Sequence, residues 1–214
     1  MFIHEEAAAY LKPFRWERDP LLLRMEEEAK IEKIPIVLPD TIQLISQLVM
    51  MKNARSILEI GTAIGYSTLW LARSAPQGEI ISIDQDEKMI ERAQKNLEEA
   101  GVAHRVTLLH HNASKGLPHP YREKRFDFLF IDAGKDEYET YVNGYLPHLE
   151  DGGVIVTDNI FFHGLAFPNH KEDPRNAWIG EKIDRYNHFI FQHPALLTHF
   201  LPIGDGIAIS IKRS

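Results

Sequence analysis

The sequence of 214 residues contains no cysteine, which excludes disulfides, zinc–thiolate sites, iron–sulfur clusters and cysteine nucleophiles. Any metal would have to be held by oxygen or by histidine. No apolar run approaches the roughly 20 residues that span a bilayer, and the first ten residues lack both the basic start and the apolar core of a signal peptide. We therefore expect a soluble, cytoplasmic protein that does not bind membranes.

Positive charge is in the minority. The chain has 24 Lys and Arg against 31 Asp and Glu, a net charge of −7, which argues against a surface that binds nucleic acid as a whole but not against a local basic patch. Length and an ordinary globular composition suit one domain. We expect a single domain over 1–214, with a helical extension over 1–52 and an α/β core over 53–214.

Short runs of β-branched and aromatic residues alternate with helical patterns from about residue 55. The runs predict buried parallel strands over 56–60, 79–84, 106–109, 126–132 and 153–158. A helix is predicted over 86–100, with Asp86 as its N-cap and Gly101 at its C-terminal cap, and another after Asp136. This alternation is typical of an α/β sandwich with a mostly parallel sheet.

Both ends of the chain depart from this pattern. The runs 198–203 and 207–211, on either side of a Gly-Asp-Gly turn, predict an antiparallel hairpin. By analogy, such a hairpin beside five parallel strands is the seven-stranded, Rossmann-like layout of class I methyltransferases. The first 50 residues predict helices over 20–31 and 40–51, with Asp40 as an N-cap. They would form either a lid on the substrate side or a cover for the sheet edge.

The turn after the first strand carries Glu59, Gly61 and Gly65. Gly61 permits a tight turn, and Gly65 lets the next helix approach the sheet. The third glycine of a dinucleotide site is missing, and Glu59 would repel a diphosphate. Asp84 ends the second strand, where a carboxylate can bind the ribose hydroxyls of either NAD or S-adenosylmethionine (SAM). Because SAM carries an ammonium and a sulfonium but no phosphate, the set favours SAM.

Carboxylate and amide side chains end the fourth and fifth strands, at Asp132 and at Asp158-Asn159. The carboxyl ends of parallel strands share one edge of the sheet, so these groups should converge beside the cofactor. Two carboxylates and an amide oxygen suit Mg²⁺, with Mn²⁺ or Ca²⁺ as alternatives. Lys135 would stand beside the cation as a general base, while the cation acidifies the same substrate hydroxyl for attack on the SAM methyl group.

These segments resemble the motifs of the cation-dependent O-methyltransferases, which include catechol and caffeoyl-CoA O-methyltransferases. The resemblance runs from about residue 35 to the C-terminus and rests on 59–67, 131–138 and 158–159. It implies that Lys135 and Asp132 are catalytic and that Asp132, Asp158 and Asn159 bind the metal. The implied cofactor contacts are Val37, Glu59, Gly61, Thr62, Gly65, Ser67, Asp84, Ala113 and Asp132. One departure is Gly134, where plant members carry a second aspartate that touches SAM.

The resemblance also suggests acceptors and a homodimer. Length and the segment 34–36 look most like bacterial tRNA 5-hydroxyuridine methyltransferases, so wobble 5-hydroxyuridine, giving 5-methoxyuridine, is the first predicted substrate. A small catechol-like or caffeoyl-CoA-like phenol is the alternative, because both kinds of acceptor offer two neighbouring oxygens to one metal. A local basic patch for tRNA would come from Lys30, Lys33, Lys171 and Arg175.

Aromatic residues over 161–167 could stack on a flat substrate ring, or serve as core or dimer contacts. Two other classes of protein stay open at this point. One is a nicotinamide-dependent oxidoreductase, against which the missing third glycine and the antiparallel tail argue. The other is a non-catalytic protein that binds SAM.

Overall fold

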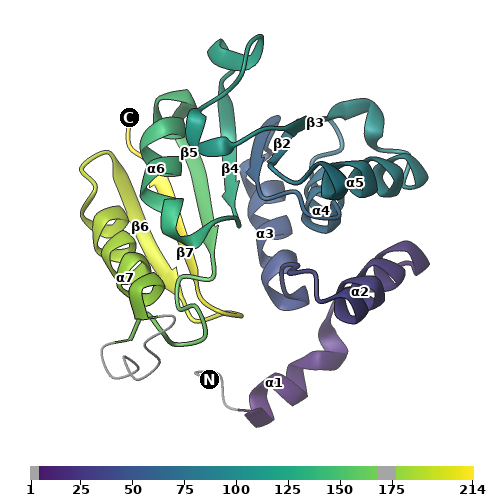
Figure 1. Ribbon diagram of the computed structural model, residues 1–214. Coiled ribbons are helices and arrows are strands. Elements are labelled where there is room, and N and C mark those ends of the chain that lie inside the picture. The colour runs from purple at the N-terminus through teal and green to yellow at the C-terminus, as the bar shows by residue number, and fades with distance from the viewer. Residues whose placement is uncertain (1–4, 168–176) are drawn as a thin grey trace.

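The computed structural model, which describes residues 5–167 and 177–214, has one mixed sheet in the order β3-β2-β1-β4-β5-β7-β6 (Figure 1). The strands are β1 Ser56–Ile60, β2 Glu79–Asp84, β3 Val106–His110, β4 Phe126–Ile131, β5 Leu149–Asp158, β6 Leu196–Leu201 and β7 Ile207–Lys212. Strands β1 to β5 are parallel to one another, and β7 is antiparallel to both β5 and β6. The predicted mostly parallel sheet with an antiparallel C-terminal hairpin is therefore confirmed.

Helices cover both faces of this sheet. They are α1 Glu5–Leu11, α2 Pro20–Glu32, α3 Pro39–Lys52, α4 Tyr66–Ser74, α5 Glu87–Glu99, α6 Tyr138–Tyr145 and α7 Ala177–Gln192. One buried cluster joins α2, α3, α4 and α5 to one face, and a second joins α6 and α7 to the other, which makes three layers. Within the described residues, no helix is both long and apolar enough to cross a membrane.

Helix α5 follows directly from its sequence signals. The Asp86 side chain accepts hydrogen bonds from the backbone N–H groups of Lys88 and Met89, as an N-cap does. At the other end Gly101 has a φ of 71°, and the next N–H, of Val102, donates to the carbonyl of Leu97. This is a glycine-terminated helix end, and both predicted caps are confirmed.

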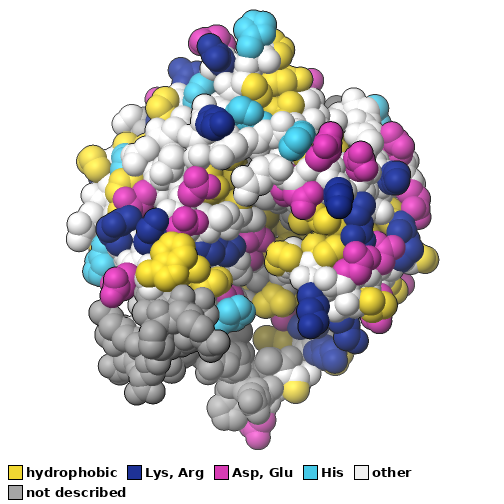
Figure 2. Space-filling model, viewed as in Figure 1, with side chains coloured by type: hydrophobic (Ala, Val, Ile, Leu, Met, Phe, Trp, Pro, Cys, Tyr) yellow, Lys and Arg dark blue, Asp and Glu magenta, His cyan; other side chains and the backbone are white. Residues whose placement is uncertain are grey.

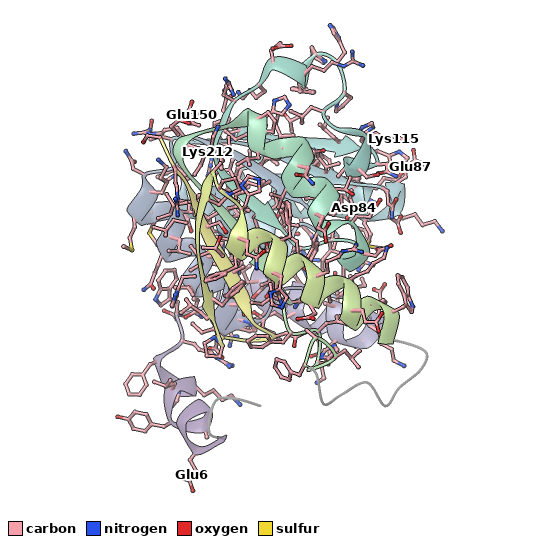
Figure 3. All side chains as sticks on the ribbon, turned by 90° about the vertical axis from the view of Figure 1, so that its left-hand side faces the viewer. Glu6, Asp84, Glu87, Lys115, Glu150 and Lys212 are labelled. Atoms are coloured by element: carbon pink, nitrogen blue, oxygen red, sulfur yellow. The ribbon has the colours of Figure 1, made fainter. Side chains whose placement is uncertain are left out.

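The N-terminal helices belong to the packed body, except for α1. Helix α3 buries Ile42, Ile45 and Val49 against one face of the sheet, so it covers that face. Helix α1, with Glu6 near its start, stands away from the body in two views at right angles (Figures 1 and 3). The segment 35–38, between α2 and α3, is the part of this region that borders the cavity described below.

Two local predictions are wrong, and one helix was not predicted. Helix α3 has Leu38 as its N-cap, not Asp40, because Pro39 suits the first helical position; Asp40 instead pairs with Arg15 at 2.6 Å. Strand β5 begins at Leu149 rather than at residue 153, since its register with β4 shifts at a bulge without ending the strand. Helix α7 was missed because its sequence contains Gly180 and several aromatic and β-branched residues, which are weak helix formers.

Candidate active site

A cavity of about 560 Å³ opens at the carboxyl ends of the parallel strands. In Figure 2 the surface is hollowed near the middle of the visible face, with hydrophobic and acidic side chains around the hollow. The size falls in the range of small-ligand sites, and its place at the strand ends is where α/β sheets bind ligands. Predicted site residues that line it are Val37, Gly61, Thr62, Ser67, Asp84, Ala113, Asp132, Lys135 and Asn159.

The turn after β1 is built around Gly61, which has a φ of 104°. A Cβ atom at Gly61 would lie 2.0 Å from the carbonyl oxygen of Asp132, so only glycine lets the two strand ends come together. Two backbone hydrogen bonds, each 2.9 Å long, hold this contact. The Gly61 N–H donates to the Ile83 carbonyl, and the Asp132 N–H donates to the Ile60 carbonyl. The tight turn predicted for Gly61 is confirmed, and it joins the ends of β1, β2 and β4.

Asp84 ends β2 and shapes the same turn. Its Oδ2 accepts a hydrogen bond from Ala63 N–H at 2.8 Å, and its Oδ1 accepts one from Asp86 N–H at 2.9 Å. Ala63 has a φ of 43°, a conformation that costs a residue with a side chain and must be held by its surroundings. Asp84 thus fixes the turn while its carboxylate borders the cavity.

Glu59 and Gly65 do not line the cavity. Gly65 lies where a Cβ atom would be 3.0 Å from the Cβ of Ala93, so it allows the start of α4 to approach helix α5, whereas the sequence had predicted an approach to the sheet. Glu59 is fully buried beneath the turn; its Oε2 accepts hydrogen bonds from the hydroxyls of Thr68 and Ser82, and its Oε1 has no partner among the described residues. Burial raises the pKa of Glu59 to about 7, against the effect of the hydroxyl hydrogen bonds.

Lys135 and Asp132 meet at the end of β4. The Lys135 Nζ lies 2.7 Å from Asp132 Oδ1, and both side chains are four-fifths buried. The same ammonium sits 5.5 Å from the centre of the Tyr138 ring, a favourable cation–π distance. The lysine is therefore held over the site and does not extend into solvent.

Asp158 ends β5 and is buried behind the cavity wall, with an exposed fraction of 1%. Its pKa is raised to about 8 by burial and by the charge on Asp132. Asn159 follows with a φ of 58° and does line the cavity. Within the described residues, no three His, Asp or Glu side chains form a metal-binding group, so a cation here needs the amide of Asn159 as a third protein ligand. The donors fit Mg²⁺ in kind: oxygen atoms with an excess of negative charge.

Helix α6 is bonded to the end of β5 and to the turn after β3 by two tyrosines that were not predicted as site residues. The Tyr138 hydroxyl donates to the backbone carbonyl of Asp158 at 2.9 Å. The Tyr145 hydroxyl donates to the backbone carbonyl of Ala113 at 2.7 Å. A third tyrosine, Tyr141, lines the cavity and donates to Glu137 Oε2. These tyrosines are three and then four positions apart, so they lie on one face of the helix. That spacing could have identified them from the sequence as a group that contacts the same part of the fold.

The turn between β6 and β7 supplies another residue that was missed as a site residue. Asp205 lines the cavity, although the sequence identified its Gly-Asp-Gly segment only as a hairpin turn. Of the aromatic segment, Phe162 and His163 line the cavity, whereas Phe161 packs against the Phe167 ring, 5.2 Å away between centres. Within the segment, Phe162 and His163 are therefore the aromatic side chains placed where a substrate could contact them.

The predicted basic patch has only two members in the described part of the chain. Lys30 is four-fifths exposed and 3.9 Å from Glu27, and Lys33 is an exposed residue at the end of α2. Lys171 and Arg175 lie outside the described residues. Neither Lys30 nor Lys33 lines the cavity.

Comparisons with known proteins agree on one family. The family model described as O-methyltransferase matches residues 20–213 of the chain. A catechol O-methyltransferase of Mycobacterium tuberculosis is 42% identical over 167 residues, which cover 75% of this chain and 73% of that protein. Caffeoyl-CoA O-methyltransferase 1 of Arabidopsis thaliana is 30% identical over 184 residues, 80% of this chain and 69% of that protein. The crystal structure of an O-methyltransferase from Bacillus cereus in complex with SAH has a TM-score of 0.83, with 29% identity and 96% of each chain covered.

Proposed function

Because the chain belongs to the O-methyltransferase family, we propose that it transfers the methyl group of SAM to one hydroxyl of a small phenol that carries a second oxygen beside it. The observation that carries this proposal is the pairing of Lys135 with Asp132 next to the buried Asp158, at the end of a cavity that the Gly61 turn borders. One wall suits a cationic nucleoside, and the adjoining wall suits a metal and a base.

We assign the cofactor to the wall made by β1, β2 and the turn after β3. The carboxylate of Asp84 would accept the ribose hydroxyls, the backbone at Ala113 would meet the adenine, and Val37 would contact the methionine part. Glu59 would support a cationic ligand from below, since its carboxylate is fully buried beneath the turn. When bound, SAM supplies an activated methyl group on its sulfonium.

We assign a divalent cation, Mg²⁺ in the first instance, to Asp132, Asp158 and Asn159. Such an ion would neutralise the carboxylates whose burial and mutual repulsion raise the pKa of Asp158, and it would supply Lewis acidity to the acceptor oxygens. In its neutral amine form, Lys135 would take the proton from the reacting hydroxyl at its Nζ. The buried walls exclude water, so the resulting oxyanion is kept for the methyl group.

The small-phenol acceptor is better supported than the wobble uridine of tRNA. The relatives described above are named for catechol and for caffeoyl-CoA, and the rim of the cavity includes apolar side chains such as Val37, Leu38 and Phe162, which suit a flat ring. The acidic net charge of −7 also favours a small acceptor over a polyanion. The comparisons give no support to a nicotinamide-dependent oxidoreductase.

Labelled methyl transfer from SAM tests this function. The protein would be offered catechol, caffeoyl-CoA and tRNA that lacks wobble methoxy groups, each with EDTA and again with Mg²⁺ in excess. We expect labelling of a phenol that EDTA abolishes and Mg²⁺ restores. Labelling of tRNA alone would replace the phenol by the wobble base, and labelling that EDTA leaves unchanged would refute the metal assignment.

We further propose that the chain forms a single methyltransferase domain and works as a homodimer in the cytoplasm. Light scattering would then give twice the 24.6 kDa of one chain. A mass of one chain at micromolar concentration would contradict the dimer without affecting the proposed reaction.

A further inference from the structure

The turn between β6 and β7 lies at the active-site edge of the sheet although it comes near the end of the chain. Strand β7 is antiparallel to β5, and Ile207 at its start pairs with Asp158 at the end of β5. The residues just before Ile207 are therefore placed beside the residues just after Asp158. This register brings Asp205 to the cavity wall.

Asp205 and its neighbour fasten the segment 159–163, which follows strand β5. The Ile160 N–H donates to the Gly206 carbonyl at 3.1 Å, and the Phe161 N–H donates to the Asp205 carbonyl at 2.9 Å. The Asp205 carboxylate adds a third bond, since its Oδ1 accepts from the His163 N–H at 2.8 Å. Only this third bond uses a side chain, so it is the one that depends on residue 205 being an acid.

The glycines on either side of Asp205 bring the turn into close contact with two parts of the fold. A Cβ atom at Gly206 would lie 2.7 Å from the Phe161 ring, and one at Gly204 would lie 2.3 Å from Oγ1 of Thr41 on α3. The turn is thus inserted between the segment and α3. The Asp205 backbone is therefore held from both sides, and this fixes the position of its carboxylate at the cavity wall.

The fastened segment needs such support. Asn159, Phe162 and His163 have φ values of 58°, 44° and 57°, in the left-handed region that side chains disfavour. All three line the cavity. A strained segment keeps its shape only when surrounding bonds hold it, and two of those bonds come from Asp205.

The carboxylate of Asp205 also adds charge to the site. It is 15% exposed, lines the cavity, and contributes with Asp132 to the unfavourable charge around Asp158. A turn needed only for shape would be served as well by a neutral acceptor such as asparagine. A carboxylate at this place is useful where a cation binds nearby.

We propose that Asp205 is a positioning residue of the active site, which holds the segment 159–163 in its strained conformation and strengthens the binding of the cation at Asn159 and its two aspartates. The inference rests on the proposed function, because it takes those three residues as the metal ligands. Asp205 itself is not placed on the reacting atoms. Its effect reaches the cation and the acceptor through the segment and through its charge.

Two substitutions separate the bond from the charge. Asp205→Ala removes both, and Asp205→Asn keeps an oxygen that can accept from the His163 N–H but removes the charge. The matched control is Asp151→Asn, which removes one exposed carboxylate near the other end of β5, where Asp151 lies 3.5 Å from Lys212. Three quantities are measured on each: the Kd of Mn²⁺ without SAM or acceptor, the Kd of SAH, and KM and kcat for the acceptor.

We expect Asp205→Ala to raise the Kd of Mn²⁺ and the KM for the acceptor by about tenfold or more, the effect of losing a hydrogen bond to a charged group. Asp205→Asn should raise the Kd of Mn²⁺ but leave KM within about threefold of the unmodified protein. The Kd of SAH should stay unchanged in both, because the proposed cofactor wall is formed by β1, β2 and the turn after β3. The control should match the unmodified protein throughout.

An unchanged Kd of Mn²⁺ in Asp205→Asn would refute the proposed role of the Asp205 charge in cation binding. An unchanged KM in Asp205→Ala would refute the proposed role of Asp205 in positioning the segment. If Asp205→Ala does not fold, amide hydrogen exchange at His163 in the unmodified protein and in Asp205→Asn tests the bond instead. Protection of that amide in both supports the bond, and rapid exchange in the unmodified protein refutes it. Failure of the proposed function looks different, because the unmodified protein would then transfer no methyl group.

Discussion

Substitution of Gly61 by alanine tests whether the active site depends on the contact between the ends of β1 and β4. The added Cβ atom would lie 2.0 Å from the carbonyl oxygen of Asp132 and 2.8 Å from its carbonyl carbon, which are backbone atoms and cannot turn aside. The φ of 104° adds strain for any residue with a side chain. Two penalties therefore act at one position.

Their sizes can be worked out separately. A left-handed backbone costs an alanine about 1–2 kcal/mol. Forcing an extra methyl group into a packed place costs about 1–3 kcal/mol more, so that we expect Gly61→Ala to lower the free energy of unfolding by about 2–5 kcal/mol in all. The Kd of SAH should rise by more than about tenfold, because the turn and the end of β4 must move apart.

Gly101→Ala is the matched control for strain alone. Gly101 has a φ of 71°, and a Cβ atom there would meet nothing within 4 Å. The free energy of unfolding of Gly101→Ala should fall by only about 1–2 kcal/mol, and its Kd for SAH should equal that of the unmodified protein. Urea denaturation gives the free energies and calorimetry the affinities. If Gly61→Ala is no less stable than Gly101→Ala and binds SAH equally well, the strand-end contact does not shape the site.

Other substitutions test the cofactor and base assignments. Since burial raises the pKa of Glu59 to about 7, SAM, a cation, should bind about tenfold more tightly at pH 8, where Glu59 is ionised, than at pH 6. Glu59→Gln should bind SAM with no such pH dependence, and equal pH dependence in both proteins by calorimetry would contradict this role. Lys135→Ala should lower kcat by about 10²- to 10⁴-fold while the Kd of SAH stays the same; unimpaired initial rates would exclude it as the base. Asp84→Ala should raise the Kd of SAH by about tenfold or more, because two backbone amides and the ribose lose one acceptor, and an unchanged Kd would exclude that contact.

The convergence of Asp132, Lys135 and Asn159 on one cavity was predictable because it depends on strand direction alone. All the strands that carry the motifs are parallel, and the carboxyl ends of parallel strands share an edge. The caps of α5 were predictable for a similar reason, since the hydrogen bonds that make them are local.

Features that depend on how distant segments pack were not predictable. Asp205 reaches the cavity only because of the register between β7 and β5, which a hairpin signal does not specify. Glu59 was expected to touch the cofactor from its place before the turn, but its side chain lies behind the wall, in contact with Thr68 and Ser82. The sequence of a strand predicts that its side chains alternate between the two faces of the sheet. Which face lies toward a ligand depends on the segments that cover the sheet, and the strand does not specify those.

The two tyrosine hydroxyls of α6 have a consequence for how this site can diversify. One helix of eight residues is hydrogen-bonded to Ala113, where we propose that the adenine binds, and to Asp158, which we propose as a metal ligand, so this helix would set the spacing between the two proposed sites. The rim at Phe162 and His163 belongs to a separate loop. In the proposed reaction, changes in that rim would therefore alter which acceptor enters while the distance from the methyl donor to the base stays constant.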